Sequence, residues 1–223
     1  FHPDPSVKRQ SGFLNPSLGS SKNSGNSIST PYFYLISNDK DLTIKPQLFD
    51  NNKFLLQNEF RQKTKKTLSI VDFGFVNGHD SSISDKGGTR SHVFTKSIID
   101  LSLKDYIYST VKVDYQKASN DNYLKVFKLD SPIMPVSSEV LESVIKLDLE
   151  HDDYDLTSSL EMYETLKGSN SDRYQYVLPS YNFNKNFYLE DFTGSLNFNS
   201  YGNNTLKDTN VTTSTFINDL NYS

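Results

Sequence analysis

Side chains that could bind a metal or carry out catalysis are few and scattered in this sequence. Its four histidines are His2, His79, His92 and His151, and they do not form the spacing typical of metal ligands. The chain has no cysteine, which excludes thiol catalysis and disulfides within it. The acidic stretch 150–155 (EHDDYD) could hold a cation, but its composition favours a tight turn. We therefore predict no metal site and no cofactor.

Patterns typical of nucleophilic catalysis or nucleic-acid binding are also weak. The stretch 80–88 (DSSISDKGG) combines serine and aspartate but lacks the strand–turn–helix setting that presents a nucleophilic serine. Lysine plus arginine number 23 and aspartate plus glutamate 27, and the two signs are interspersed. Because there is no basic stripe, a nucleic-acid partner has little support. The sequence favours a protein that is neither an enzyme nor a nucleic-acid-binding module.

Two prolines near the start interrupt stretches that otherwise look like neighbouring β-strands. Pro16 ends the stretch 8–16 (KRQSGFLNP), and Pro31 lies within 27–36 (SISTPYFYLI). Proline has no backbone N–H to donate to a strand ladder, so sheets normally confine it to edges, strand starts or bulges. Either these prolines mark turns or strand ends, or they weaken one pair of strands.

The elements that hold these residues follow a period of two in hydrophobicity. In the stretch 41–49 (DLTIKPQLF), Leu42 and Leu48 share one face, while Lys45 lies on the other. Clusters of asparagine, aspartate, glycine and serine separate such stretches, as turns require. The pattern predicts an all-β fold, an antiparallel meander of about 11–12 long strands.

The length of these strands suits a membrane. A tilted strand needs about 9–11 residues to cross a bilayer, with apolar residues facing lipid and polar residues facing the lumen. The 15 phenylalanines and 14 tyrosines, several of them near strand ends, suit interfacial girdles. We therefore expect a partial segment of a large transmembrane β-barrel. A soluble β-sandwich or β-solenoid would show the same alternation.

The barrel hypothesis assigns side chains to two faces. The expected convex, lipid-facing belt consists of Leu42, Leu48, Val71, Phe73, Val111, Leu147, Leu149, Leu196 and Phe198. The expected concave, lumen-facing charges are Lys45, Glu59, Lys112, Asp114, Glu142 and Asp148. There is no apolar run of about 18 residues that would form a transmembrane helix. Because the last residues stop within a strand-like alternation, we expect the chain to be a fragment of a longer protein.

Motifs in the first 127 residues resemble the family of LPS-assembly outer-membrane proteins, the LptD family. The barrel of that family begins with a proline-rich segment, a K-R-x-S-G-F-L-x-P motif and a strand pair containing L-P-Y-Y. Residues 8–16 fit the first motif, and Pro31 and Tyr32 fit the second. Further stretches that resemble the family, in the same order, are 41–48 (DLTIKPQL), 58–61 (NEFR), 117–127 (KASNDNYLKVF) and, more weakly, 176–184 (YVLPSYNFN).

The resemblance implies a fold and a task. Residues 1–10 would lead in from a missing periplasmic domain, and residues 11–223 would form the N-terminal portion of an outer-membrane barrel. Such a barrel receives lipopolysaccharide (LPS) from a periplasmic bridge protein and inserts it into the outer leaflet of a Gram-negative outer membrane. Its expected partners are LPS, outer-membrane lipid, a plug lipoprotein in the barrel and the bridge protein, which acts through the missing domain.

The resemblance also assigns roles to particular residues. The lateral gate of the family has a proline in each of its first two strands, and Pro16 and Pro31 occupy the matching positions. Inward-facing cations that could meet the phosphates of LPS are Lys45, Arg61, Lys96 and Lys112, although we favour a solvated polar lumen as the explanation for them. Another outer-membrane barrel, such as a receptor or porin, or a secreted β-rich binding protein, would share the alternation but would leave the ordered motifs unexplained.

Overall fold

The computed structural model is built of β-strands joined by turns and loops. It describes residues 9–22, 24–50, 52–81, 84–167, 173–188, 194–207 and 210–222. The first four strands are short: β1 (Gly12–Phe13), β2 (Ser17–Ser21), β3 (Gly25–Ser29) and β4 (Tyr32–Ser37). The longer strands are β5 (Lys40–Phe49), β6 (Phe54–Lys63), β7 (Thr67–Ser81), β8 (Ser84–Asp100), β9 (Tyr108–Ala118), β10 (Val140–Glu150), β11 (Tyr154–Thr165), β12 (Tyr174–Tyr188), β13 (Ser195–Lys207) and β14 (Val211–Tyr222). The helix of the described residues is α1 (Tyr123–Phe127).

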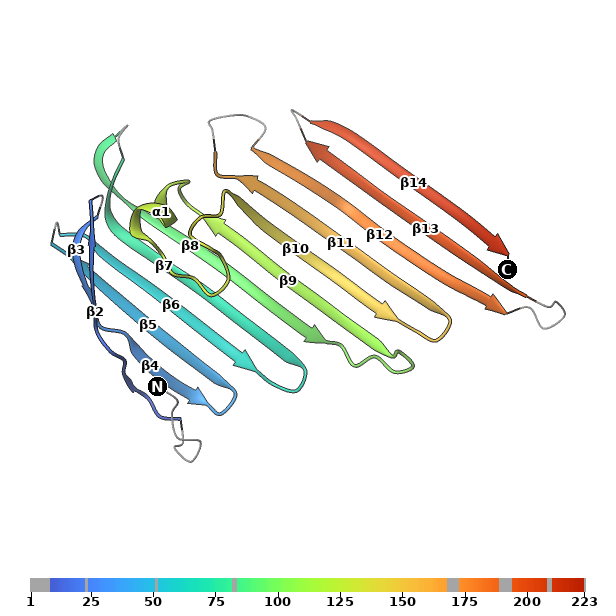
Figure 1. Ribbon diagram of the computed structural model, residues 1–223, viewed down its shortest axis with the longest axis horizontal. Coiled ribbons are helices and arrows are strands. Elements are labelled where there is room, and N and C mark those ends of the chain that lie inside the picture. The colour runs from blue at the N-terminus through green and yellow to red at the C-terminus, as the bar shows by residue number, and fades with distance from the viewer. Residues whose placement is uncertain are drawn as a thin grey trace. The chain divides into compact units, whose positions relative to one another are not determined.

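The strands form one meander in which sequence neighbours pair. From β4 to β14 the order in the sheet is the order in the chain (Figure 1). β14 is at one edge of the sheet, and β1 pairs with β4 at the opposite edge. Every pair with a described register is antiparallel. The two ends of this order are not neighbours, so the sheet is open. The predicted all-β antiparallel meander is confirmed.

The number of elements differs from the predicted 11–12 strands for a specific reason. The first hairpin consists of two strands that are each broken into two pieces, β1 with β2 and β3 with β4. Pro16 lies in the first break and Pro31 in the second. If each broken strand is counted once, the 14 strands correspond to 12.

The chain forms two compact units. Unit 1 consists of residues 1–95 and 116–138, and unit 2 of residues 96–115 and 139–223. In unit 1, β9 is followed by the segment 119–138, which carries α1 and lies against the sheet: Phe127 makes an edge-to-face contact with Phe49 of β5, with ring centroids 5.6 Å apart. This segment brings a small buried core to one face of β5–β8, formed by Phe49, Leu55, Val76, Phe94, Tyr123, Leu124, Phe127, Leu129 and Met134.

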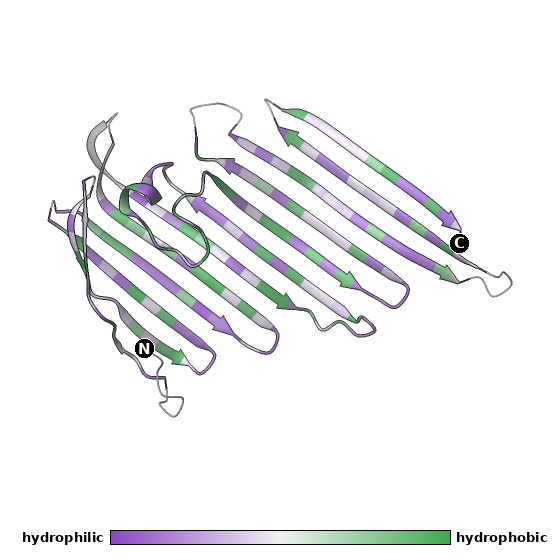
Figure 2. Ribbon diagram, viewed as in Figure 1, coloured by the Kyte–Doolittle hydropathy of each residue, from purple (hydrophilic) through white to green (hydrophobic). Residues whose placement is uncertain are grey.

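The predicted alternation of faces is confirmed in unit 1. The register places Leu42, Phe60 and Val71 in one row across β5–β7, and side chains alternate between faces along each strand. The expected belt residues Leu42, Leu48, Val71 and Phe73 therefore share one face, and Lys45 and Glu59 share the opposite one. Figure 2 shows the corresponding alternation of hydropathy along the strands.

Unit 2 has the same alternation. Val111 lies opposite Leu147, and Lys112 lies opposite Lys146, across β9 and β10. The expected belt residues of this unit, Val111, Leu147, Leu149, Leu196 and Phe198, share one face, whereas Lys112, Asp114, Glu142 and Asp148 share the other. No helix among the described residues is both long enough and apolar enough to cross a membrane.

Candidate functional site

The first hairpin is interrupted at the same level in both of its strands. On one side of the interruption Phe13 pairs with Tyr32, and on the other Ser17 pairs with Ser29. Between these pairs the backbone N–H of Leu14 donates to the carbonyl of Pro31 over 2.8 Å. The sequence-predicted prolines are thus brought together in one break, where neither can donate a ladder hydrogen bond.

A third proline extends this break into the next strand. β5 pairs with β3 as far as Gln47 and with β4 from Ile44, so Lys45 and Pro46 lie opposite the break. The hydroxyl of Ser29 donates to the carbonyl of Pro46 over 3.0 Å. Pro46 lies on the apolar face of its strand, and sequence analysis did not connect it with Pro16 and Pro31. The equal spacing of these three prolines was the available signal.

Side chains hold the strand pieces on the β1–β4 side of the break. Arg9 forms an ion pair with Asp41 of β5 and lies over the ring of Phe33, with 5.5 Å between the guanidinium carbon and the ring centroid. The backbone N–H of Leu35 donates to the Ser11 hydroxyl over 2.8 Å. The short β1 is therefore fixed by side chains as well as by its ladder.

The first strand is the exposed edge of the sheet. β1 pairs with β4 and β2 with β3, and no other strand of the described residues lies beyond them. Phe13 and Leu18 are 80% and 84% exposed, the highest values among the large apolar residues described. An edge of this kind presents unpaired backbone groups and is a template for pairing with a further strand.

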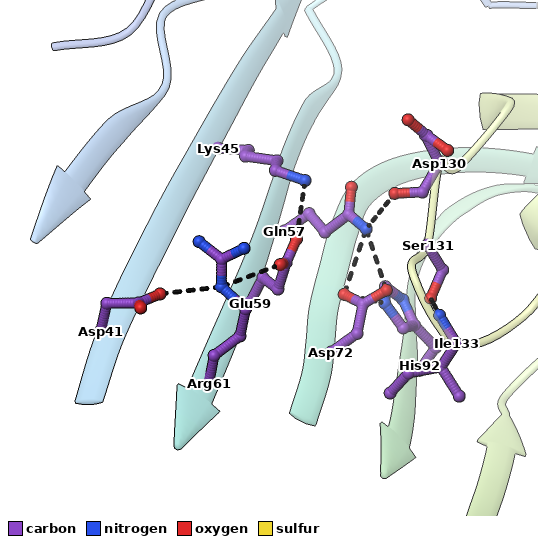
Figure 3. A network of polar contacts seen from close by, with 10 residues as sticks. All are labelled: Asp41, Lys45, Gln57, Glu59, Arg61, Asp72, His92, Asp130, Ser131 and Ile133. Atoms are coloured by element: carbon purple, nitrogen blue, oxygen red, sulfur yellow. Dashed lines mark hydrogen bonds and ion pairs between the residues drawn. The ribbon is translucent and has the colours of Figure 1, made fainter. Parts of the chain in front are cut away.

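Two of the four candidate cations lie in a charged cluster on the polar face of unit 1. Lys45 pairs with Glu59 at 3.2 Å. Arg61 contacts Asp41 at 2.8 Å and Glu59 at 3.5 Å. These contacts join β5 to β6 (Figure 3). The positive charges of Lys45 and Arg61 are thus largely compensated by carboxylates.

The other two candidate cations differ in their surroundings. Lys112 is 3.6 Å from Asp148, which also pairs with Lys146 at 2.8 Å. Lys96 is exposed and comes two residues after Phe94 and four after His92 on β8, so its side chain is on the same face of that strand as theirs. No ion pair within the described residues involves Lys96. Of the four predicted contacts, Lys96 is the one whose charge is not compensated in this part of the chain.

A buried polar network, which sequence analysis missed, connects the sheet of unit 1 to the segment 119–138. The side-chain amide of Gln57 donates to the Asp72 carboxylate over 3.1 Å and to the Asp130 carbonyl over 3.0 Å. His92 contacts Asp72 through Nε2 at 3.3 Å and the Tyr123 hydroxyl through Nδ1 at 3.1 Å. Gln57, Asp72 and His92 converge in this way in Figure 3.

The partners of His92 define its tautomer. The Asp72 carboxylate accepts hydrogen bonds, so Nε2 of a neutral His92 carries the proton and Nδ1 accepts from the Tyr123 hydroxyl. Burial raises the pKa of Tyr123, and the charge of Asp72 raises it further, so the hydroxyl keeps its proton and remains a donor. Because Asp72 and His92 have fully buried side chains, every link in this network matters for the position of the segment.

In the part of the chain that the structure describes, no three histidine, aspartate or glutamate side chains lie together in a way that could hold a metal ion. His2 lies outside the described residues, and nothing is described of the His79 side chain. His92 is occupied by the polar network, and His151 stacks on Tyr154 at a turn, with ring centroids 4.9 Å apart. His92 and His151 therefore both contact neighbouring side chains of the fold.

Comparison with known proteins gives a consistent set of relatives. No family model matches the chain. The LPS-assembly protein LptD of Pseudomonas fluorescens is 26% identical over 179 residues, which cover 79% of this chain and 18% of that protein. LptD of Idiomarina loihiensis is 27% identical over 83% of this chain and 23% of its own length. LptD of Pectobacterium atrosepticum is 25% identical over 92% of this chain and 25% of its own length.

The chain is related to the LptD family. The resemblance expected from the motifs at its start is therefore confirmed over most of the chain, including residues beyond 130. The chain spans between 18% and 25% of the length of these LptD proteins. An open sheet with free edges agrees with a segment of a larger LptD-like barrel.

Proposed function

We propose that this chain is part of an outer-membrane β-barrel that inserts LPS into the outer leaflet, and that the broken first hairpin is one side of its lateral gate. The name of these relatives, LPS-assembly protein, describes assembly rather than a catalysed reaction. The task involves moving an amphiphile without covalent chemistry. In the full-length protein, residues 1–10 would lead in from the periplasmic side and residues 11–223 would form the first part of the barrel wall.

The observation that carries this proposal is the shared break at Pro16 and Pro31 on the free edge of the sheet. Every backbone polar group in lipid needs a hydrogen-bond partner, so a closed barrel wall allows no sideways exit. A seam can open if its ladder is incomplete, because each missing hydrogen bond lowers its stability by about 0.5–1.5 kcal/mol. Pro16 removes a donor from the strand that would meet the last strand of the barrel, and Pro31 removes one from the strand next to it.

The two faces of the sheet support a path for an amphiphile. In each unit, one face is apolar and exposed, as lipid contact requires, and the other is polar. A hollow of about 330 Å³ on the apolar face of unit 2 is lined by side chains such as Val113, Ile145, Leu160 and Met162. Acyl chains would leave through the gate toward such a surface, while the sugars would remain on the polar side.

Among the predicted cation contacts for LPS, we favour Lys96. An uncompensated ammonium attracts a phosphate more strongly than one already paired with a carboxylate. Lys45, Arg61 and Lys112 are paired, so we expect them to contribute less. The plug lipoprotein, the periplasmic bridge protein and outer-membrane lipid are the proposed partners of the full-length protein.

Depletion of the full-length protein in its own bacterium tests this function. Cells that lose the protein should carry less LPS on their surface and accumulate it at the inner membrane, while other outer-membrane barrels still assemble. Restoring the natural protein should reverse both effects. Unchanged surface LPS after complete depletion would contradict the proposal.

A further inference from the structure

The polar face of unit 2 carries many asparagines on β12, β13 and β14. Four registered rows cross β12, β13 and β14, from Asn186–Asn197–Asn221 to Ser180–Asn203–Thr215. Because side chains alternate along each strand, all of these residues share the face of Lys112 and Asp148. We call the asparagines on this face the amide track; they are Asn182, Asn184, Asn186, Asn197, Asn199, Asn203 and Asn221.

The amide track is held in place by hydrogen bonds between its own side chains. Asn197 donates to Asn186 over 2.6 Å and to Asn184 over 3.4 Å. Asn184 in turn donates to Asn199, and Asn199 donates to Asn197. Four amides thus form a fixed array across β12 and β13. Each amide has two donors and two acceptor lone pairs, so the array keeps hydrogen-bonding capacity for a ligand.

The rim of the track is open. The side chains of Asn182 and Asn221 are exposed and make no hydrogen bond within the described residues. Tyr201 lies in the same row as Asn182 and is 40% exposed, although it is on the polar face. Its row neighbour on β14 is Ile217, which is 49% exposed. An exposed aromatic–aliphatic pair thus sits within a surface of amides.

The polar face has fewer charged side chains on β12–β14 than on β9–β11. Within the four rows, Asp219 is the charged residue among those that the structure describes on this face. On β9–β11 the same face carries Lys112, Lys146 and Asp148, which are linked by ion pairs. The polar face of unit 2 therefore changes from ionic on β9–β11 to almost neutral on β12–β14.

We propose that the amide track is a contact surface for the neutral sugars of LPS, an inference that rests on the transport function proposed above. Sugar hydroxyls both donate and accept hydrogen bonds, and asparagine amides match them in both respects. The apolar faces of sugar rings match the Tyr201–Ile217 pair, because a tyrosine offers an apolar surface with a polar end. A phosphate-rich part of the same molecule would prefer the lysines of β9–β11.

Hydrogen bonds from neutral groups also suit a surface along which a ligand moves, rather than one that retains it. A moving ligand must bind strongly enough to enter and weakly enough to leave. Neutral hydrogen bonds are about half as strong as those to charged groups. Repeated amides therefore offer a long glycan many weak and equivalent hydrogen bonds, and no single site binds it tightly.

Site-specific photocrosslinking in cells that carry the full-length protein tests the proposal. A photoreactive residue replaces Asn182 on the track, Lys112 on the ionic strands or Leu147 on the apolar face. Each variant is expressed in two strains, one with complete LPS and one with LPS truncated to its innermost sugars. At Asn182 we expect LPS adducts that fall severalfold in the truncated strain. At Leu147, where only acyl chains reach, adduct yield should not depend on the glycan.

The outcomes separate this inference from the function on which it rests. Adducts at Lys112 with none at Asn182, or equal adducts at Asn182 in both strains, would overturn the amide track but leave transport intact. No adduct at any polar-face position would count against transport itself. Because the glycan is changed in the lipid rather than in the protein, folding is the same in both arms.

A substitution pair gives an independent readout. Asn197→Leu with Asn199→Leu removes four amide contacts, and we expect the ratio of long-glycan to short-glycan LPS on the cell surface to fall. Loss of one hydrogen bond of about 1 kcal/mol corresponds to a change of about fivefold in an equilibrium constant. Asn204→Leu is the matched control, because Asn204 lies on the same strand but on the opposite face and binds the Leu178 carbonyl. An equal fall in both variants would overturn the proposal.

Discussion

At the scale of single residues, Gln57 has hydrogen-bond partners on two parts of unit 1. It is 6% exposed and is the donor that joins Asp72 of β7 to the Asp130 carbonyl of the segment 119–138. A buried acceptor that loses its donor costs about 1–3 kcal/mol. The position of the segment over the polar face therefore depends in part on this amide, beside the His92–Tyr123 hydrogen bond and the apolar contacts.

Replacing Gln57 by leucine should loosen the segment without unfolding the sheet. We expect amide hydrogen exchange to increase tenfold or more over residues 123–129, since about 1.4 kcal/mol corresponds to a factor of ten. The relevant amides include those of Val126 and Leu129, which are bonded to Asn122 and Leu124. Mass spectrometry of the corresponding peptides measures this change.

Asn58→Leu is the matched control for this prediction. Asn58 is the next residue on the same strand, faces the opposite side and donates to the Phe73 carbonyl over 3.5 Å. Its replacement should leave exchange over residues 123–129 unchanged. Equal protection of the segment in the Gln57 variant and the natural protein would show that the other contacts, including the His92–Tyr123 hydrogen bond, hold the segment without the Gln57 amide.

Gly74 is a second residue on which the network depends. A Cβ atom at this position would come within 2.4 Å of the Leu56 carbonyl oxygen and 3.0 Å of His92 Cε1. Gly74→Ala should therefore push β7 away from β6 and lower the free energy of unfolding by about 1–3 kcal/mol. Gly88→Ala, whose Cβ would meet only the flexible end of Arg90 at 3.7 Å, should have little effect. Thermal unfolding measures the loss of stability in each variant. An unchanged melting temperature for Gly74→Ala would contradict the close contact between Gly74 and the Leu56 carbonyl.

At the scale of elements, the first hairpin has a break that divides each of its two strands into two pieces. Pro16→Ala and Pro31→Ala would each restore a backbone donor and release a fixed φ angle at that break. We expect the double variant to show slower amide exchange around Leu14 and reduced delivery of LPS to the surface, with normal assembly. Thr30→Ala changes the same break without adding a donor and should behave like the natural protein. Faster exchange in the proline variant would contradict the proposed role.

The elements were largely predictable, whereas the contacts between them were not. Period-two stretches such as 41–49 and 140–150 assign both strands and faces correctly because alternation is a local property of the strand. Sequence analysis predicted of the segment 119–138 only the family resemblance of residues 117–127. Its contacts with Gln57 and His92 were not predicted, because these residues come from strands far away in sequence. The compensation of Lys45 by Glu59 likewise depends on cross-strand register, which the sequence does not reveal.

At the scale of the whole molecule, we expect the two edge strands of the open sheet to pair with further strands of the full-length protein. Exposed apolar residues on β14, such as Phe216 at 67% and Leu220 at 64%, face the same side as the apolar residues of β13. The chain spans at most 25% of the relatives compared above. We expect β14 to pair with the next strand of the longer chain and β2 to meet its last strand.

The most direct test of the gate is to lock that seam in the full-length protein. A cysteine in place of Ser20 on β2 is oxidised to a cysteine placed opposite it in the last strand, and surface LPS is measured in cells that depend on this variant. The control locks a pair within the hairpin, Ser17→Cys with Ser29→Cys, which are register partners. The gate hypothesis predicts that surface LPS falls only in the seam-locked variant and recovers when the disulfide is reduced. Normal delivery with the seam covalently shut would contradict it.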